Sequence, residues 1–239
     1  MDRKKFYSLV RKEMPRGKLT SVQVETMNAI FDEVDDMQLS HVAYILATIH
    51  HETGGTFEAC REGFHNKPKT HANALKAVAW LYRHKKISTN YALPHKNGKC
   101  YYGRGLVQIT WYDNYKKLSK HVGVDLVRYP DRALDLDIAV RITVVGMVKG
   151  LFRKGKSLSK MLPEAPTTTQ WKRARDIING DIKKNGPVIG RKAVRFLLAL
   201  EASQTVHDEV EKPKVVKKTI KKKKKESLLG SIRHWFRRR

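Results

Sequence analysis

The segment at residues 50–55, HHETGG, places one carboxylic acid, Glu52, immediately before two glycines. Apolar residues recur before it at helical spacing, at Val42, Ile45 and Ile49, so Glu52 is expected to end a helix and to continue its buried stripe. Partial burial disfavours the ionised form of a carboxyl group, which suits a general acid. A single helix-terminal Glu more often has no chemical role, so a catalytic Glu52 requires partners elsewhere in the chain.

A second carboxylate follows the glycine turn. Glu62 lies ten residues after Glu52, and Glu58 is a competing candidate in the same stretch. Two carboxylates beside a sugar-sized cleft can divide the work, because one protonates the leaving oxygen while the other, ionised, activates water. Spacing alone leaves the choice between Glu62 and Glu58 open.

Metal-dependent hydrolysis is disfavoured by the same segment. His51-Glu52 begins like the zinc-protease motif, but the position that requires a second histidine holds Gly55. The other histidines lack clustered ligand spacing, so neither a metal nor another cofactor is expected.

Residues 105–110, GLVQIT, alternate polar and apolar side chains with period two. In an extended segment Gln108 and Thr110 face one side, while Val107 and Ile109 face the other. The pattern therefore predicts a short extended segment that presents two polar side chains in parallel.

The elements that must position these residues are mainly helical. Periodicity and capping residues predict helices over 3–14, 20–36 with Thr20 or Ser21 as N-cap, a helix capped by Ser40 and ending at Glu52, 73–83, 114–121 capped by Asp113, 138–152, 171–178 and 190–202. The helix over 138–152 is apolar on most of its circumference, which is typical of a central buried helix.

The composition indicates one catalytic-sized domain with an anionic partner. The 239 residues are 41% hydrophobic, enough for one core of roughly 150–200 residues. The formal charge is +26, far more than solubility requires. The N-terminus lacks a signal peptide's apolar run, so we expect a chain without its own export signal. Cys60 and Cys100 are expected to be free thiols, although a bridge between them stays possible.

The C-terminal region differs in composition from the rest. We predict a domain over 1–205, a flexible Lys-rich linker over 206–226 and a short basic amphipathic helix over 227–239. The helix would carry one membrane-interacting apolar stripe between arginines, formed by Leu228, Leu229, Ile232, Trp235 and Phe236. This pattern favours attachment to an anionic membrane or lipopolysaccharide, and a disordered solubilising tail is the alternative.

HHETGG together with CYYGRGLVQITWYDNYKKL at 100–118 resembles glycoside hydrolase family 19, the class I chitinases, and the related bacteriophage endolysins of the lysozyme-like superfamily. The resemblance extends over roughly residues 37–200 and includes IINGD at 177–181. It implies a lysozyme-like catalytic domain that is mainly α, with a small extended or β segment at the cleft. It also implies that Glu52 is the general acid, Glu62 the second carboxylate, and Thr110 a catalytic water-holding residue. The substrate-binding positions that it implies are Gln108, Asn114, Asn179 and Arg191. His51 is a further expected binding residue beside Glu52. Tyr102 and Trp111 are expected to approach the cleft, because sugar rings pack on aromatic side chains, and core packing is the alternative for each.

The resemblance and the charge together favour an endolysin-type glycosidase that cleaves β-1,4 bonds of peptidoglycan by an inverting mechanism and causes bacterial lysis. An inverting enzyme requires a carboxyl separation of about 6.5–9.5 Å. We expect a monomer that binds no specific nucleic acid and is made in the host bacterial cytoplasm before its release to the wall. Three alternatives remain: a chitinase, a lytic transglycosylase that uses Glu52 alone, and a nonenzymatic membrane- or nucleic-acid-binding protein on a lysozyme-like scaffold.

Overall fold

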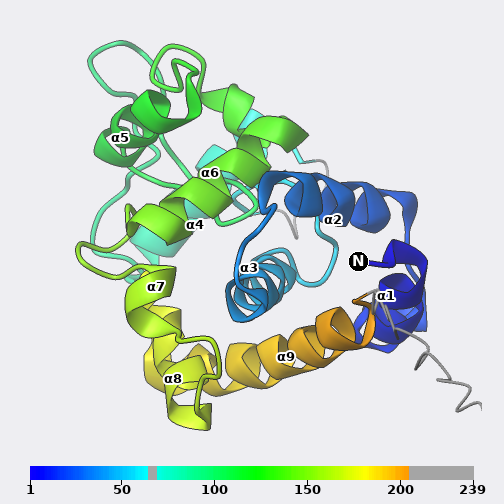
Figure 1. Cartoon of the computed structure of the whole chain (residues 1–239). Helices are drawn as coiled ribbons and strands as arrows, with labels where there is room; N and C mark the ends of the chain where they lie inside the picture. The colour runs from blue at the N-terminus through cyan, green and yellow to red at the C-terminus, as the bar shows by residue number, and fades with distance from the viewer. Residues whose placement is uncertain (64–68, 205–239) are drawn as a thin grey trace, which may run out of the picture. The chain divides into compact units, whose positions relative to one another are not determined.

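Helices make up most of the computed structural model, which describes residues 1–63 and 69–204 (Figure 1). The α-helices of this part are α1 (Arg3–Val10), α2 (Ser21–Glu33), α3 (Leu39–Glu52), α4 (His71–Arg83), α5 (Tyr112–Val122), α6 (Leu136–Lys149), α7 (Leu158–Met161), α8 (Thr168–Arg173) and α9 (Ile182–Ala202). Two short strands, β1 (Cys60–Arg61) and β2 (Arg104–Gly105), pair antiparallel. The predicted class, mainly α with a small β segment, is confirmed. The predicted linker and terminal helix, with the stripe from Leu228 to Phe236, lie outside the described residues.

Helix α3 occupies the centre of the core and delivers Glu52. Ten of its fourteen residues are buried, and the long helix α9 packs against it (Figure 1). Helix α6 is also largely buried, because its apolar residues are shared between two hydrophobic clusters. The apolar pattern of 138–152 therefore arises because α6 packs against two hydrophobic clusters. The central helix of the core is α3, and not α6 as its sequence suggested.

Some predicted helix starts are confirmed and others are wrong. Thr20 caps α2 in a capping box with Gln23, as expected. Ser40 does not cap α3, because the helix begins at Leu39 and the buried Ser40 hydroxyl donates to the carbonyl of Pro163 at 3.0 Å. Asp113 lies inside the first turn of α5 and does not cap it. For Ser40, local propensity fails because its hydroxyl bonds a carbonyl group 123 residues away in the chain.

The last helix is longer than its sequence predicts. α9 begins at Ile182, well before the expected start at 190, and contains Pro187. Its glycines allow the backbone of α8 to come close, since a Cβ at Gly186 would lie 2.5 Å from the carbonyl oxygen of Lys172. Glycine and proline therefore serve helix packing here, whereas their usual helix-breaking tendency led to the shorter prediction.

The predicted helices over 3–14 and 171–178 each end in 3₁₀ geometry, at Arg11–Glu13 and at Ala174–Ile177.

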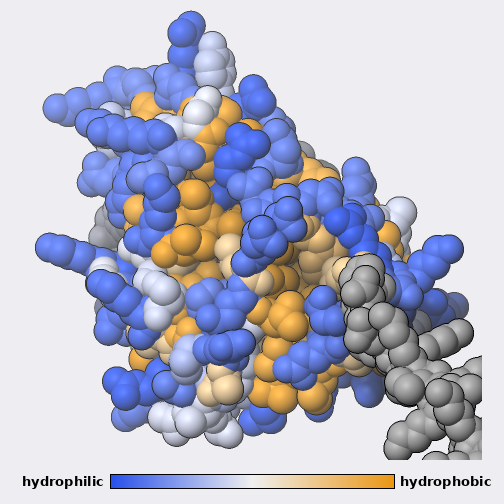
Figure 2. Space-filling view, viewed as in Figure 1, coloured by the Kyte–Doolittle hydropathy of each residue, from blue (hydrophilic) through white to orange (hydrophobic). Residues whose placement is uncertain are grey.

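Apolar residues reach the surface between polar ones on the face shown in Figure 2. Within the described ranges, no helix is both long and apolar enough to cross a membrane.

Candidate active site

Glu52 is the last residue of α3, and its side chain is 17% exposed. The two glycines end the helix as predicted, because Gly54 and Gly55 adopt φ of 61° and 84°, values that favour glycine. A Cβ at Gly55 would lie 3.1 Å from the buried imidazole ring of His50. The HHETGG segment thus fixes one carboxyl at a helix end that is open to solvent.

The environment of Glu52 is charged, which its apolar helix did not predict. The nearly fully buried Arg175 donates from Nη1 to Glu52 and from Nε to Asp181 at 2.5 Å. Asn185 also donates to Asp181, at 2.5 Å. Arg175 and Asp181 were not identified from the sequence. The only signal in the sequence was the IINGD segment at 177–181. Arg175 comes two residues before this segment and lies on the 3₁₀ turn, while Asp181 ends the segment and immediately precedes α9.

The carboxyls of Glu52 and Asp181 share one guanidinium group. Burial acts to raise the pKa of Asp181, but the hydrogen bonds from Arg175 and Asn185 outweigh it and lower that pKa. Burial opposes the charge of Arg175, yet its two acidic partners raise its pKa. The guanidinium group of Arg175 therefore holds the carboxyl groups of Glu52 and Asp181 in fixed positions.

His51 lies half-buried beside this network. Burial lowers the pKa of His51, and although the charge of Glu52 opposes that effect, the charge of Arg175 adds to it. A neutral imidazole next to Glu52 is compatible with the predicted substrate contact, which stays a prediction.

Glu62 is held at the end of β1 by two hydrogen bonds. The hydroxyl of Tyr91 donates to its Oε1, and the backbone N–H of Gly103 donates to its Oε2 at 2.9 Å. Glu58, the competing candidate, is exposed and forms an ion pair with Lys69 at 2.5 Å. Of the two, Glu62 is therefore the carboxylate with a fixed position.

Gln108 lies in a tight turn, which contradicts the predicted extended segment. Its φ is 54°, and the backbone groups of Arg104 and Ile109 bond to each other across the turn. The predicted separation of side chains is nevertheless found, since Val107 and Ile109 are buried while Gln108 and Thr110 are partly exposed. The period-two pattern was satisfied by a turn because both conformations can direct alternate side chains to opposite sides.

The turn that carries Gln108 contacts the segment that carries Glu62. The amide of Gln108 donates to the carbonyl of Cys60 at 2.8 Å. A Cβ at Gly103 would lie 2.7 Å from Oε1 of Gln108 and 3.1 Å from Oε2 of Glu62. The thiol of Cys60, in turn, has a pKa raised to about 11 by burial and by the nearby acids, Glu52 among them. Glu62 and Gln108 therefore lie together beside Gly103, and the charge of Glu52 is felt at Cys60, whose carbonyl binds Gln108.

The other predicted residues of this segment have different surroundings. The amide of Asn114 donates to the carbonyl of Thr110 at 2.9 Å, so it supports the turn that carries Thr110. Trp111 is 46% exposed and packs on Tyr91, with ring centroids 5.2 Å apart. Tyr102 is fully buried beneath Arg104, which is 3.7 Å from its ring centroid. Its expected approach to an open cleft is therefore wrong, because the Tyr102 ring packs against Arg104.

Two predicted binding residues come from the C-terminal half. Asn179 is exposed and follows the 3₁₀ turn of Arg175, next to the Glu52 network. Arg191 is exposed on α9 and lines a hollow with Trp171 and Pro187. The arginine that contacts Glu52 is Arg175, so a binding role for Arg191 stays a prediction without a contact to the carboxylates. Cys60 and Cys100 are both free, as expected.

Comparison with known proteins identifies the family. The model of the class I chitinase family, glycoside hydrolase family 19, matches residues 26–147, half of the chain. The chain therefore belongs to glycoside hydrolase family 19.

Individual relatives match shorter regions. Endochitinase 1 of Theobroma cacao is 33% identical over 89 residues, which cover 37% of this chain and 26% of that protein. Chitinase 5 of Oryza sativa is 32% identical over 101 residues, 42% of this chain and 30% of that protein. The chain thus spans only about a quarter to a third of these relatives. Chitinase C from Streptomyces griseus, a solved structure, aligns with a TM-score of 0.47 and 20% identity over 83% of this chain and 91% of that one.

Gly103 provides a test of how the site is held. Gly103→Ala is expected to lower glycan cleavage about 10-fold or more, because the added methyl displaces both Gln108 and Glu62. Initial rates on a soluble glycan, beside thermal unfolding midpoints, measure this effect. Gly98→Ala is the control for lost stability: its Cβ would meet no atom within 4 Å, but its φ of 74° strains any side chain, so it should lower the unfolding midpoint and leave the rate near the wild-type value. Equal rates for Gly103→Ala and the wild type would contradict the assigned site.

Proposed function

We propose that this protein is a glycosidase that cleaves β-1,4 bonds of the peptidoglycan glycan strand by acid/base catalysis. The observation that carries the proposal is that two carboxylates, Glu52 and Glu62, are each held in place by hydrogen bonds. Glu52 shares a guanidinium group with a second acid, while Glu62 accepts hydrogen bonds from a hydroxyl and a backbone N–H. Two carboxyl groups that are each held in place can divide the work, with Glu52 as the proton donor and Glu62 as the base that activates water.

In the proposed reaction Glu52 protonates the leaving oxygen. Glu62 removes a proton from water, which Thr110 helps to hold, and the water attacks the anomeric carbon from the opposite face. The configuration at that carbon is then inverted. Gln108, fixed by the carbonyls of Cys60 and Gly105, would bind the sugar between the two acids.

The substrate assignment rests on charge. The excess of 26 positive charges favours an anionic polymer such as the bacterial wall, whereas chitin is neutral. Chitin is the second candidate, because the matched relatives are named endochitinases. In an endolysin role the protein would be made in the host cytoplasm and act on the wall as a monomer after release.

Product analysis tests the reaction. Digestion of purified peptidoglycan should yield reducing ends, with the α-anomer formed first in NMR spectra. Anhydro-muramic ends in the mass spectrum would instead identify a lytic transglycosylase. Cleavage of chitin oligomers with no cleavage of peptidoglycan would favour the chitinase alternative.

We also propose that the C-terminal residues bind anionic lipid or lipopolysaccharide, on the basis of their sequence. Residues 212–239 hold thirteen Lys or Arg and one acid. Deleting them is expected to leave activity on purified wall within about twofold and to weaken lysis of whole Gram-negative cells several-fold, because surface attachment alone is lost. Turbidity assays on both substrates measure the difference. Loss of activity on soluble glycan after truncation would argue against a separate attachment role.

A further inference from the structure

Helix α4 forms one wall of a hollow of about 710 Å³ that is also lined by Glu62. Lys76, Trp80 and Arg83 lie on one face of this helix at i, i+4 and i+7, and all three are exposed. The opposite face packs Ala74 and Val78 into a small hydrophobic cluster, which fixes the direction of the helix. The carboxylate proposed as the base therefore faces a cationic and aromatic surface.

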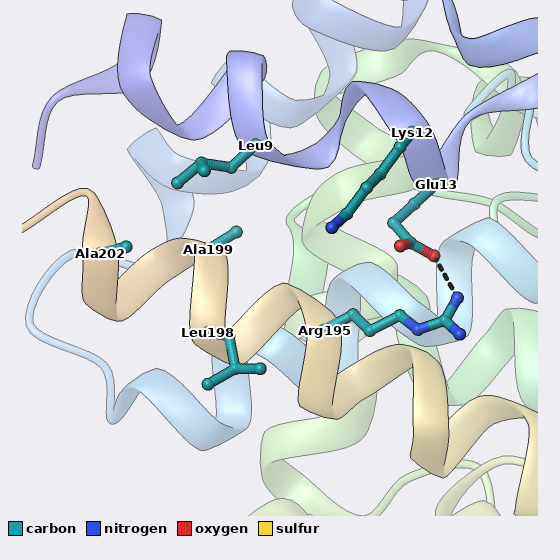
Figure 3. Close-up of a pocket in the computed structure, with 7 residues that line it drawn as sticks. All are labelled: Leu9, Lys12, Glu13, Arg195, Leu198, Ala199 and Ala202. Carbon is teal, nitrogen blue, oxygen red and sulfur yellow. Dashed lines mark hydrogen bonds and ion pairs between the residues drawn. The ribbon is translucent and has the colours of Figure 1, made fainter.

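The two cations on this surface have no acidic partner in the part of the chain that the structure describes. Among the described residues neither Lys76 nor Arg83 forms an ion pair, and Glu62 is bonded to Tyr91 and Gly103 instead. The hollow between α1 and α9 differs, because its Arg195 is already paired with Glu13 at 2.8 Å (Figure 3). The sequence around α4 is also strongly basic, since residues 63–112 contain nine Lys or Arg and no Asp or Glu; Glu62 is the acid that lines the hollow.

Trp80 adds an apolar platform between these cations. Its indole ring is 48% exposed and stacks on the imidazole of His84, with centroids 4.2 Å apart. Sugar rings present apolar faces that pack on such aromatic surfaces. An exposed indole flanked by a Lys and an Arg suits a sugar that carries a carboxylate.

We propose that the α4 hollow is a subsite for the acidic part of the glycan strand, the lactyl or peptide carboxylates of muramic acid units. Trp80 stacks on the sugar, while Lys76 and Arg83 attract the carboxylates. This inference rests on the proposed function, because it assigns the hollow to the strand that Glu52 and Glu62 would cleave. The subsite would distinguish peptidoglycan from chitin, which has the same backbone but no carboxylates.

Binding to two oligosaccharides of equal length tests the subsite. Full-length Glu52→Gln protein is titrated calorimetrically with a muramic-acid-containing oligosaccharide and with a chitin oligosaccharide. We expect the acidic ligand to bind about fivefold more tightly, and Lys76→Gln/Arg83→Gln to remove that difference while chitin binding is unchanged. Trp80→Ala should weaken both ligands, because stacking does not depend on charge.

Lys4→Gln/Lys5→Gln is the matched control, since it removes two exposed charges from α1 and should keep the preference for the acidic ligand. Three results would overturn the subsite: equal binding of both ligands, a preference that survives in Lys76→Gln/Arg83→Gln, or a preference lost in the control. Cleavage by the wild type is measured separately. A preserved binding preference without any cleavage would refute the glycosidase proposal and leave the subsite standing.

Discussion

Glu52→Gln is expected to lower the rate of glycan cleavage about 10³-fold, because an amide cannot donate the proton that the leaving oxygen needs. Glutamine has nearly the same size and can still accept the hydrogen bond from Arg175, so the fold should be retained. Release of reducing ends from purified peptidoglycan measures the rate, and thermal unfolding shows that the variant is folded. If Glu52→Gln lysed permeabilised cells as fast as the wild type, the membrane-active alternative would be favoured over catalysis.

The comparison of Glu62→Gln with Glu58→Gln decides which acid is the partner. Glu62 is held by Tyr91 and Gly103, whereas Glu58 is paired with Lys69 at the surface. We therefore expect a large loss of activity for Glu62→Gln and a change of less than about twofold for Glu58→Gln, since exposed ion pairs contribute little. The opposite order would assign the base to Glu58.

Arg175→Met has the second large expected effect, about 3 kcal/mol of lost unfolding free energy together with an approximately 100-fold lower rate. The substitution leaves the carboxylates of Glu52 and Asp181 close together without the guanidinium group that binds both. Their repulsion costs stability and moves Glu52 from its position. Chemical unfolding and initial rates measure the two effects. Arg173→Met, two residues earlier and exposed, is the control and should behave like the wild type.

The ion pairs of Arg175 with Glu52 and Asp181 also make the stability lost in Arg175→Met depend on pH. The pKa of Asp181 is lowered in the folded state, so its contribution to stability is complete above the unfolded value of about 3.9 and is lost as pH falls through the lower folded pKa. The stability gap between the wild type and Arg175→Met should therefore narrow below about pH 4. A gap that stays constant through that range would show that lost packing, not the ion pairs, causes the destabilisation.

Local residue patterns were sufficient to predict the position of Glu52 at a helix end, since helical periodicity and two glycines are properties of adjacent residues. They were also sufficient for the mainly helical class and for the Thr20 cap. The pairing of Glu62 with Tyr91 and Gly103 was not predictable, because those groups lie 29 and 41 residues away in the chain. The start of α9 was not predictable either, because it depends on the close packing of Gly186 against α8.

The sequence by itself determined the general acid candidate, the alternation that exposes Gln108 and Thr110, and the strongly basic character of the chain. Only the tertiary structure decided the surroundings of Glu52. Arg175 is 123 residues from Glu52 in the chain, and a helix that is apolar in its sequence carries no sign of a distant guanidinium group. A charge so deeply buried is stable only when opposite charges are placed beside it, and that placement depends on how α3, the 3₁₀ turn at Ala174–Ile177 and α9 pack together.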